Sequence, residues 1–309
     1  MILTSENYYS SESSKEYMSV SQFKSFLDCE AKAMAEINGD YKRESTTALL
    51  VGSYVDAFFE GTLDVFKENH PEIFLKPGGL KADFYQADEI ICRISKDSEF
   101  MKYMSGESQK IFTGEIAGVS FKGKLDSYHA DKCIVDLKVM RDFEPIWKNG
   151  KKRHFIEAWG YDIQGAVYQE LVYQNTGQKL PFVICAVTKE KIPDIAILNI
   201  PQERLDYCLG LVMNKAPHFQ EIKNGSVPAR CEKCDYCKST KKLNGAVDYC
   251  DFSEPYEMEK TDPVSIAELG NNVIPSETLK AVTELSEGKI KTKHKKSKKK
   301  KAHKIIIKF

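Results

Sequence analysis

The sequence contains no run of about eighteen apolar residues and therefore predicts no membrane-spanning helix. Its first residues lack the basic and then apolar order of a secretory signal, so we expect a cytoplasmic protein. It also lacks a Gly-rich phosphate loop, an HExxH motif and a recognisable serine triad. ATP use, zinc proteolysis and serine hydrolase chemistry therefore have no support. No internal repeat is present, and 309 residues suffice for one large domain or for a domain with an appendage.

The charges are divided unevenly along the chain. Lys and Arg number 45, as do Asp and Glu, but the segment Gly288–Phe309 holds eleven Lys and no acid. The preceding residues therefore carry 34 basic against 45 acidic side chains. This pattern predicts an acidic body with a basic tail, which either contacts phosphates without sequence preference or is merely solvated. The 42% of hydrophobic residues excludes disorder of the whole chain.

The hydrophobic periodicity changes along the chain from helical to alternating and back, which indicates an α/β fold around one mixed sheet. The nearly continuous apolar run at 181–190 is typical of a central strand that is covered on both faces. We expect helices over 19–37, 46–61, 82–98, 154–175 and 201–216, strands over 110–117, 119–128, 132–139, 181–190 and 194–200, and a loop over 62–80.

Three parts are expected along the chain. Residues 1–18 form a polar N-terminal arm, and residues 19–255 form one domain that includes a Cys-rich segment, 231–250. Residues 256–309 form a weakly structured extension that ends in the basic tail.

Two carboxylates and one lysine converge on adjacent strands. Asp136 and Lys138 are two residues apart on a strand and therefore point to the same face, and a hairpin near 130–131 brings Asp126 beside them. Paired carboxylates are the ligands that Mg²⁺ prefers, and a bound metal activates water for attack on a phosphate. The neighbouring ammonium then orients that water. From these residues alone, an Asp–Lys pair at the surface remains the alternative.

This segment resembles the PD-(D/E)XK nuclease superfamily, in which an Asp is followed by an acid-x-Lys on the next strand. The matching residues are Asp126, Asp136, Leu137 and Lys138. The resemblance implies a restriction-endonuclease-like core with a mixed central sheet flanked by helices. It also implies that both acids hold Mg²⁺ or Mn²⁺, with the carbonyl of Leu137 as a further oxygen ligand.

Two more motifs place the chain nearest the RecB-like branch of that superfamily. Gln164 and Tyr168 match its Gln-x-x-x-Tyr motif, and a spacing of four puts both on one helix face, where they can reach a phosphate or the catalytic Lys. The branch also has an upstream Gly-x-x-x-His with a metal-binding His. Here that frame runs from Gly52 to Asp56, so Asp replaces His, and an Asp also binds Mg²⁺.

Three cysteines lie within seven residues, at Cys231, Cys234 and Cys237, which is a strong metal-binding pattern. The serial spacing is closer to ferredoxin-type ligation than to a zinc ribbon. Cys250 is the nearest fourth ligand in sequence, whereas iron–sulfur members of the RecB-like branch imply Cys29. We expect a [4Fe–4S] cluster on Cys29 and the three clustered cysteines, with Zn²⁺ and Cys250 as the alternative, or no metal. In either case the metal is a structural staple.

The closest resemblance is to phage and prophage exodeoxyribonucleases of the exonuclease VIII-like group. It implies a Mg²⁺-dependent exonuclease that acts on the ends of linear duplex DNA during phage-type homologous recombination, in a bacterial host or a phage-infected cell. A single-strand annealing protein is the implied partner, and a homo-oligomer remains open. The alternatives are a catalytically weak DNA-end-binding protein of the same fold, a nuclease of the CRISPR-adaptation type, and a metal-stapled interaction module without enzymatic activity.

Overall fold

The computed structural model describes residues 1–76, 78–148 and 150–247. The chain divides into two units, Met1–Lys242 and Leu243–Phe309, and all helices and strands given below belong to the first. The predicted basic tail and Cys250 lie outside the described residues.

A mixed six-stranded sheet forms the centre of the first unit. Its strand order is β1-β3-β4-β7-β8, and β2 pairs with the other edge of β3. β4 runs parallel to β7, whereas β3 and β4 are antiparallel. The strands are β1 (Met18–Ser19), β2 (Glu107–Ile116), β3 (Val119–His129), β4 (Cys133–Met140), β7 (Phe182–Thr188) and β8 (Ile195–Asn199).

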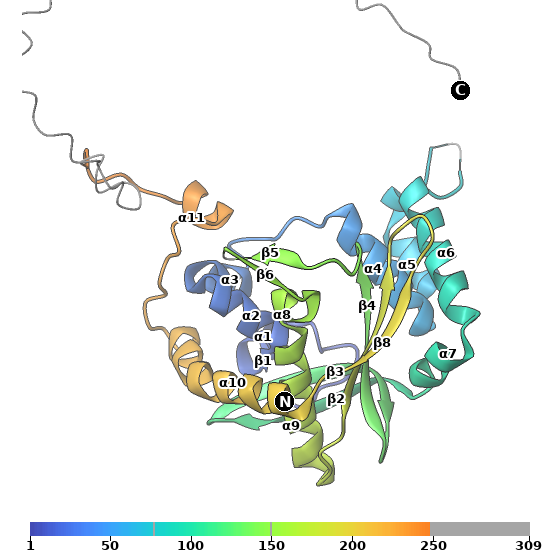
Figure 1. Cartoon of the computed structure of the whole chain (residues 1–309). Coiled ribbons are helices and arrows are strands. Elements are labelled where there is room, and N and C mark those ends of the chain that lie inside the picture. The colour runs from blue at the N-terminus through green and yellow to red at the C-terminus, as the bar shows by residue number, and fades with distance from the viewer. Residues whose placement is uncertain (77, 149, 248–309) are drawn as a thin grey trace, which may run out of the picture. The chain divides into compact units, whose positions relative to one another are not determined.

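Helices cover both faces of the sheet (Figure 1). α2 (Val20–Asp28), α9 (Tyr161–Thr176) and α10 (Gln202–Lys223) share one core with Ile134, whereas α4 (Thr47–Phe59) and α6 (Ala82–Ser95) share the other with Val135. Neighbouring residues of β4 thus enter opposite cores, because side chains alternate along a strand. β7 lies between β4 and β8 and is buried along its whole length. The predicted fold class and the predicted central strand are confirmed.

The structure differs from the sequence prediction in several elements. The helix expected over 19–37 is broken at Cys29, which is extended at φ −168° and ψ 114° and separates α2 from α3 (Glu30–Asn38). Gly160, at φ 62°, likewise separates α8 (Phe155–Trp159) from α9. The prediction of a loop over 62–80 was wrong, because α5 (Leu63–Asn69) and the short 3-10 helix η1 (Pro71–Ile73) lie there. The other elements that were not predicted are α1 (Ser11–Glu16), β1, α7 (Ser98–Met104), β5 (Ile146–Lys148), β6 (Lys151–Arg153) and α11 (Asp235–Ser239).

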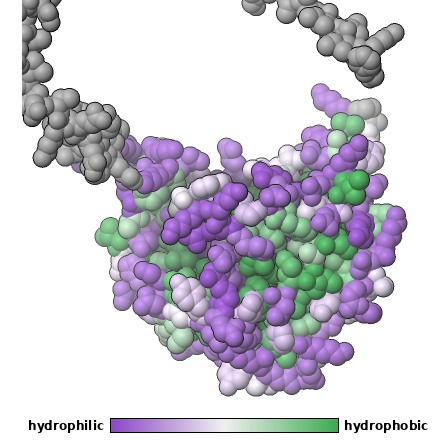
Figure 2. Space-filling view, in the orientation of Figure 1, coloured by the Kyte–Doolittle hydropathy of each residue, from purple (hydrophilic) through white to green (hydrophobic). Residues whose placement is uncertain are grey.

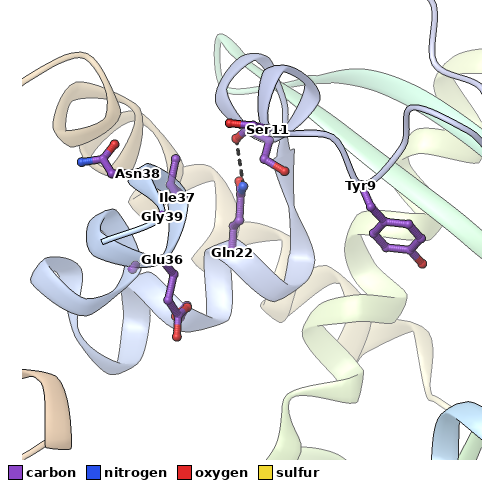
Figure 3. Close-up of a pocket in the computed structure, with 10 residues that line it drawn as sticks. Tyr9, Ser11, Gln22, Glu36, Ile37, Asn38 and Gly39 are labelled. Atoms are coloured by element: carbon purple, nitrogen blue, oxygen red, sulfur yellow. Dashed lines mark hydrogen bonds between the residues drawn. The ribbon is translucent and has the colours of Figure 1, made fainter. Parts of the chain in front are cut away.

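The N-terminal residues contact the body of the first unit. The segment contains α1 (Ser11–Glu16), and β1 pairs in parallel with β3. The ammonium of Lys122 on β3 donates to the Tyr8 carbonyl at 2.6 Å and to Ser13 Oγ at 2.8 Å. In Figure 3, Gln22 of α2 points toward α1, where its Nε2 donates to the Ser14 carbonyl at 2.8 Å, beside a pocket of about 340 Å³.

The surface is divided between polar and apolar areas. On the face shown in Figure 2, hydrophobic residues gather where Figure 1 draws β4 and β8, and hydrophilic residues cover the region of β5 and β6. Among the described residues, no helix combines the length and the apolar character needed to cross a membrane.

Candidate nuclease site

The ladder between β3 and β4 opens at Asp126. β3 pairs with β4 only from Ser127 to His129, and with β1 only at Phe121 and Lys122. In the gap between these pairings, Asp126 Oδ2 accepts a hydrogen bond from the backbone N–H of Leu137 at 2.8 Å. The carboxylate therefore replaces a strand as the partner of this N–H. Because the C=O of a strand residue points to the same side as its N–H, the Leu137 carbonyl also faces the gap.

Asp136 and Lys138 point together from β4 toward α9, as the two-residue spacing predicts. The Asp136 carboxylate is 2% exposed, and its Oδ1 accepts a hydrogen bond from Gln164 Nε2 at 2.6 Å. Its Oδ2 lies 2.5 Å from Lys138 Nζ, but among the described residues it accepts no aligned hydrogen bond. The carboxylate and the ammonium attract each other at this distance whatever the direction of the N–H bonds. A buried oxygen without an aligned donor is a suitable ligand for a cation.

Tyr168 lies one helical turn after Gln164 and is buried against β3. A Cβ at Gly123 would lie 2.9 Å from Tyr168 Cε1, so the ring reaches this position only because β3 has glycine there. Burial raises the pKa of Tyr168 well above its ordinary value, and a hydrogen bond with Gln164 partly opposes the rise. The phenol of Tyr168 therefore remains neutral and forms a hydrogen bond with Gln164. Beside both residues opens a polar pocket of about 300 Å³, which Lys24 and Lys124 also line.

α4 brings Asp56 to the same carboxylates. Burial, followed by the charge of Asp126, raises the pKa of Asp56 well above its ordinary value. Burial, followed by the charge of Asp136, raises the pKa of Asp126 to about 7. Burial lowers the pKa of Lys138, but Asp136 and Asp126 outweigh this effect and hold it above its ordinary value. The single ammonium group of Lys138 thus lies among three carboxyl groups, those of Asp56, Asp126 and Asp136. A divalent cation would reduce the repulsion that remains between the carboxylates.

This donor set fits Mg²⁺ or Mn²⁺. The charges of Asp56, Asp126 and Asp136 act on one another, the Leu137 carbonyl faces the same gap, and hard oxygen ligands are those that these ions prefer. Among the described residues, however, only the four cysteines already have their ligand atoms at the spacing of a metal site.

The sequence prediction missed three residues of the site. Glu60 raises the pKa of both Asp56 and Asp126, and its place four residues after Asp56 on the same helix was a usable signal. Tyr161 places its ring 5.1 Å from Lys138 Nζ. Lys24 of α2 has a pKa of about 8, lowered by burial and then by the charge of Lys138. Lys24 lies about 100 residues before the Asp126–Lys138 motif, so nothing in the sequence indicated that it belongs to the site.

Four cysteines form a second cluster. The sulfur atoms of Cys29, Cys231, Cys234 and Cys237 all lie within 4.8 Å of one another. The Cys29 and Cys237 sulfurs are 3.6 Å apart, and those of Cys231 and Cys237 are 3.9 Å apart. The break between α2 and α3 turns Cys29 toward the others, so the cluster joins the start of the domain to its end.

The spacing of these sulfurs can be compared with the two expected metal centres. A tetrahedral zinc ion with Zn–S bonds of about 2.3 Å holds its sulfurs about 3.8 Å apart. In a [4Fe–4S] cluster each sulfur binds a different iron on the outside of the cube, so the sulfurs lie farther apart. Burial raises the pKa of Cys231, but the backbone N–H groups of Lys233 and Cys234 outweigh it and lower this pKa to about 6, which favours a thiolate. The sulfur separations of 3.6 and 3.9 Å match those around a single tetrahedral ion, and all four sulfurs lie within 4.8 Å of one another.

Comparison with known proteins identifies the family of the chain. The family described as "PDDEXK-like domain of unknown function (DUF3799)" matches residues 19–240. The crystal structure of a "putative exonuclease" from Eubacterium rectale is 50% identical and has a TM-score of 0.79, with 82% of this chain and 98% of that chain covered.

Two further comparisons add no support. A second solved structure, that of SSO0001, is 11% identical over 63% of this chain and 85% of that chain, with a TM-score of 0.27, and carries no argument. No curated protein matches the chain. On the strength of the first two matches, the chain belongs to the PDDEXK-like family DUF3799 and, as the sequence predicts, to the PD-(D/E)XK nuclease superfamily.

Proposed function

We propose that the chain is a metal-dependent exodeoxyribonuclease that hydrolyses phosphodiester bonds at the ends of linear duplex DNA. The observation that carries this proposal is the opened ladder, where Asp126, Asp136 and Lys138 meet between β3 and β4. The crystal structure that is 50% identical belongs to a protein described as a "putative exonuclease", which supports attack from an end. Action in phage-type recombination beside an annealing protein rests on the resemblance of the sequence.

Each residue has a distinct part in the reaction. Asp126, Asp136 and the Leu137 carbonyl would hold Mg²⁺, with Asp56 completing the ligand set. When bound, the metal lowers the pKa of a coordinated water and draws charge from the phosphate. Lys138 Nζ orients the attacking water and stabilises charge on the phosphate oxygens. The water oxygen forms the new P–O bond as the P–O bond to the leaving ester oxygen breaks. The attacking water gives a proton to solvent, and the leaving oxygen takes a proton from solvent and departs as a hydroxyl group.

Gln164 and the nearby lysines position the substrate. Gln164 fixes the Asp136 carboxylate through its hydrogen bond of 2.6 Å, and it also lines the polar pocket beside Lys24 and Lys124. These ammonium groups would hold the phosphates next to the one that is cleaved.

The test compares wild type with Lys138→Ala on end-labelled linear and on circular duplex DNA, with Mg²⁺, Mn²⁺ or EDTA. Lys132→Ala, at an exposed position in the β3–β4 turn, is the matched control. We expect wild type and Lys132→Ala to degrade linear DNA only with metal and to spare circles. Cutting of circles would replace the exonuclease by an endonuclease. Binding of DNA ends without cleavage would support the alternative of an end-binding protein. The replacement of the usual His by Asp56 would then explain the lack of cleavage.

We propose in addition that the four cysteines hold one tetrahedral Zn²⁺ as a structural staple, because sulfur separations of 3.6 and 3.9 Å fit a single ion. The [4Fe–4S] cluster implied by the resemblance is the alternative. Metal analysis and the absorption spectrum of anaerobically purified protein separate the two. One zinc per chain in a colourless protein supports the proposal, and four irons with a brown colour overturn it.

A further inference from the structure

Both tryptophans of the chain are exposed, one on β5 and one at the end of α8. The sequence has only two, Trp147 on β5 and Trp159 at the end of α8, and their exposed fractions are 69% and 50%. Trp is a large residue that is usually mostly buried, and exposing two of them leaves apolar area in water. Lys148 follows Trp147 on β5 and points to the opposite face of the strand, where its Nζ donates to the Ala158 carbonyl at 2.8 Å and lies 5.9 Å from the Trp159 ring.

Basic residues are interleaved with these rings. β5 and β6 form a separate two-stranded sheet in which Trp147 pairs with Lys152 and Lys148 with Lys151. The two strands carry Lys148, Lys151, Lys152 and Arg153 and no acid. At the edge of this surface, Asp142 is paired with Arg141 at 2.6 Å, so its charge is offset. We call β5, β6 and Trp159 the β5–β6 surface; Figure 1 shows the two strands beside α8.

The β5–β6 surface continues into the candidate nuclease site. Trp159 and Tyr161 line one pocket of about 450 Å³, and the Tyr161 ring lies 5.1 Å from Lys138 Nζ. Lys24 connects the two regions a second time, because its Nζ donates to the Trp159 carbonyl at 3.1 Å and its pKa responds to Lys138. A strand that leaves the site past Tyr161 therefore meets Trp159 and then the basic hairpin.

Exposed aromatic rings alternating with cations are the features that bind single-stranded nucleic acid, in which unpaired bases stack on the rings and phosphates meet the cations. A duplex offers only its phosphates to such a surface, because its bases are already stacked. We propose that the β5–β6 surface binds the unpaired DNA strand at the end of the duplex and guides it past the site. This inference rests on the proposed nuclease function for its biological meaning, but not for its test.

The test uses the tryptophans as reporters, since both belong to the proposed surface. Lys138→Ala protein, which is expected not to cut, is titrated with a single-stranded oligothymidylate and with a blunt duplex of the same length. No Mg²⁺, Mn²⁺ or chelator is added, so that any metal on the four cysteines stays bound. We expect the single strand to quench the tryptophan fluorescence and to bind more tightly than the duplex. Added salt should weaken this binding.

Substitutions then locate the contact. Trp147→Ala should weaken binding of the single strand about tenfold, the loss expected for one stacked base. Tyr85→Ala removes an aromatic that is 56% exposed on α6 and should leave binding unchanged. Circular dichroism confirms that each variant is folded, and Trp147→Phe, which retains a stacking ring, should keep most of the affinity.

Three outcomes would overturn the inference: no quenching by the single strand, equal binding of the duplex, or equal loss in Trp147→Ala and Tyr85→Ala. Failure of the proposed nuclease function is distinguishable from all three. It would appear as wild-type protein that binds the single strand and quenches, yet never shortens linear DNA with any metal.

Discussion

The carboxylate of Asp126 binds the backbone N–H of Leu137 at 2.8 Å, across a gap where two antiparallel strands have separated. In a closed ladder this N–H would pair with a carbonyl of the neighbouring strand. Here the Asp126 carboxylate takes the place of that carbonyl. The Leu137 N–H keeps a hydrogen-bond acceptor, and an acidic side chain lies between the strands. The opening in the sheet and the candidate metal site are thus one feature.

Asp126→Asn should separate the two roles of this carboxylate. The amide oxygen still accepts from Leu137, so the fold is retained, but the lost charge weakens metal binding. We expect DNA cleavage to fall about 100-fold or more. In EDTA the melting temperature should rise, because one of several mutually repelling acids is gone. Cleavage kinetics with Mg²⁺ and thermal melts with EDTA measure the two effects. A fall in the melting temperature together with the cleavage rate would show that the two roles of the carboxylate cannot be separated.

The raised pKa of Asp126 predicts how stability depends on pH. In the folded protein this pKa is about 7, against about 3.9 in an unfolded chain. Between these values the folded state binds more protons than the unfolded state, so the metal-free protein should lose stability as pH rises from about 4 to about 7. Mg²⁺ competes with this proton, so its binding should tighten over the same range.

Melting in EDTA at a series of pH values checks the direction for Asp126. The difference between wild type and Asp126→Asn isolates this residue from the other groups. If the difference in melting temperature between wild type and Asp126→Asn does not change between pH 4 and 8, the pKa of Asp126 is not raised in the folded protein.

Asp56 is the position at which the chain departs from the Gly-x-x-x-His pattern. If its carboxylate completes the metal site, Asp56→Ala should lower cleavage about tenfold or more. Asp56→His restores the pattern and should recover activity with a higher ratio of Mn²⁺-supported to Mg²⁺-supported rate, because imidazole suits transition metals better than Mg²⁺. Rates with each ion measure this ratio. Full activity of Asp56→Ala with Mg²⁺ would remove Asp56 from the ligand set.

Cys29 is the cysteine of the cluster that is most distant in sequence. Cys29→Ser should lower the melting temperature strongly, because a structural metal contributes several kcal/mol to folding and here joins two ends of the domain. Cys133→Ser is the matched control, since Cys133 is half-buried on β4 outside the cluster. Thermal melts with and without a chelator make the comparison. Equal melting of the two variants would show that no metal depends on Cys29.

Gly123 determines how close α9 lies to β3. A Cβ at this position would stand 2.9 Å from Tyr168 Cε1, so Gly123→Ala should cost about 1–3 kcal/mol of stability by overpacking. The displaced ring should also move Gln164 and slow cleavage. Gly118→Ala is not a suitable control, because φ is 77° there, whereas Gly210, on α10, has nothing near its Cβ position. Urea unfolding of Gly123→Ala and Gly210→Ala measures the difference.

The part of the site on regular strands could be predicted from the sequence. Asp136 and Lys138 share a face because strand side chains alternate, and in the structure Asp136 Oδ2 lies 2.5 Å from Lys138 Nζ. Gln164 was found through a motif whose spacing is helical, and it contacts Asp136. The roles of these residues remain predictions.

The parts that could not be predicted depend on contacts between distant segments. Lys24 and Tyr161 approach Lys138 only after the sheet and its helices have assembled. The break at Cys29 could not be predicted either, because the flanking residues suit a helix and the other three cysteines of the cluster lie about 200 residues away in sequence. The β5–β6 hairpin has too few apolar residues to produce a clear strand pattern.

The beginning of the chain contacts two ammonium groups, that of the buried Lys122 and that of the half-buried Lys223. Lys122 donates to Tyr8 and Ser13, and Lys223 donates to the carbonyls of Ser14 and Tyr17 at 3.2 and 3.1 Å. Burial lowers the pKa of each lysine to about 8. A shortened chain that starts after Tyr17 would leave both ammonium groups without these acceptors. Residues 1–17 therefore belong in any minimal version of this domain that is made for biochemical work.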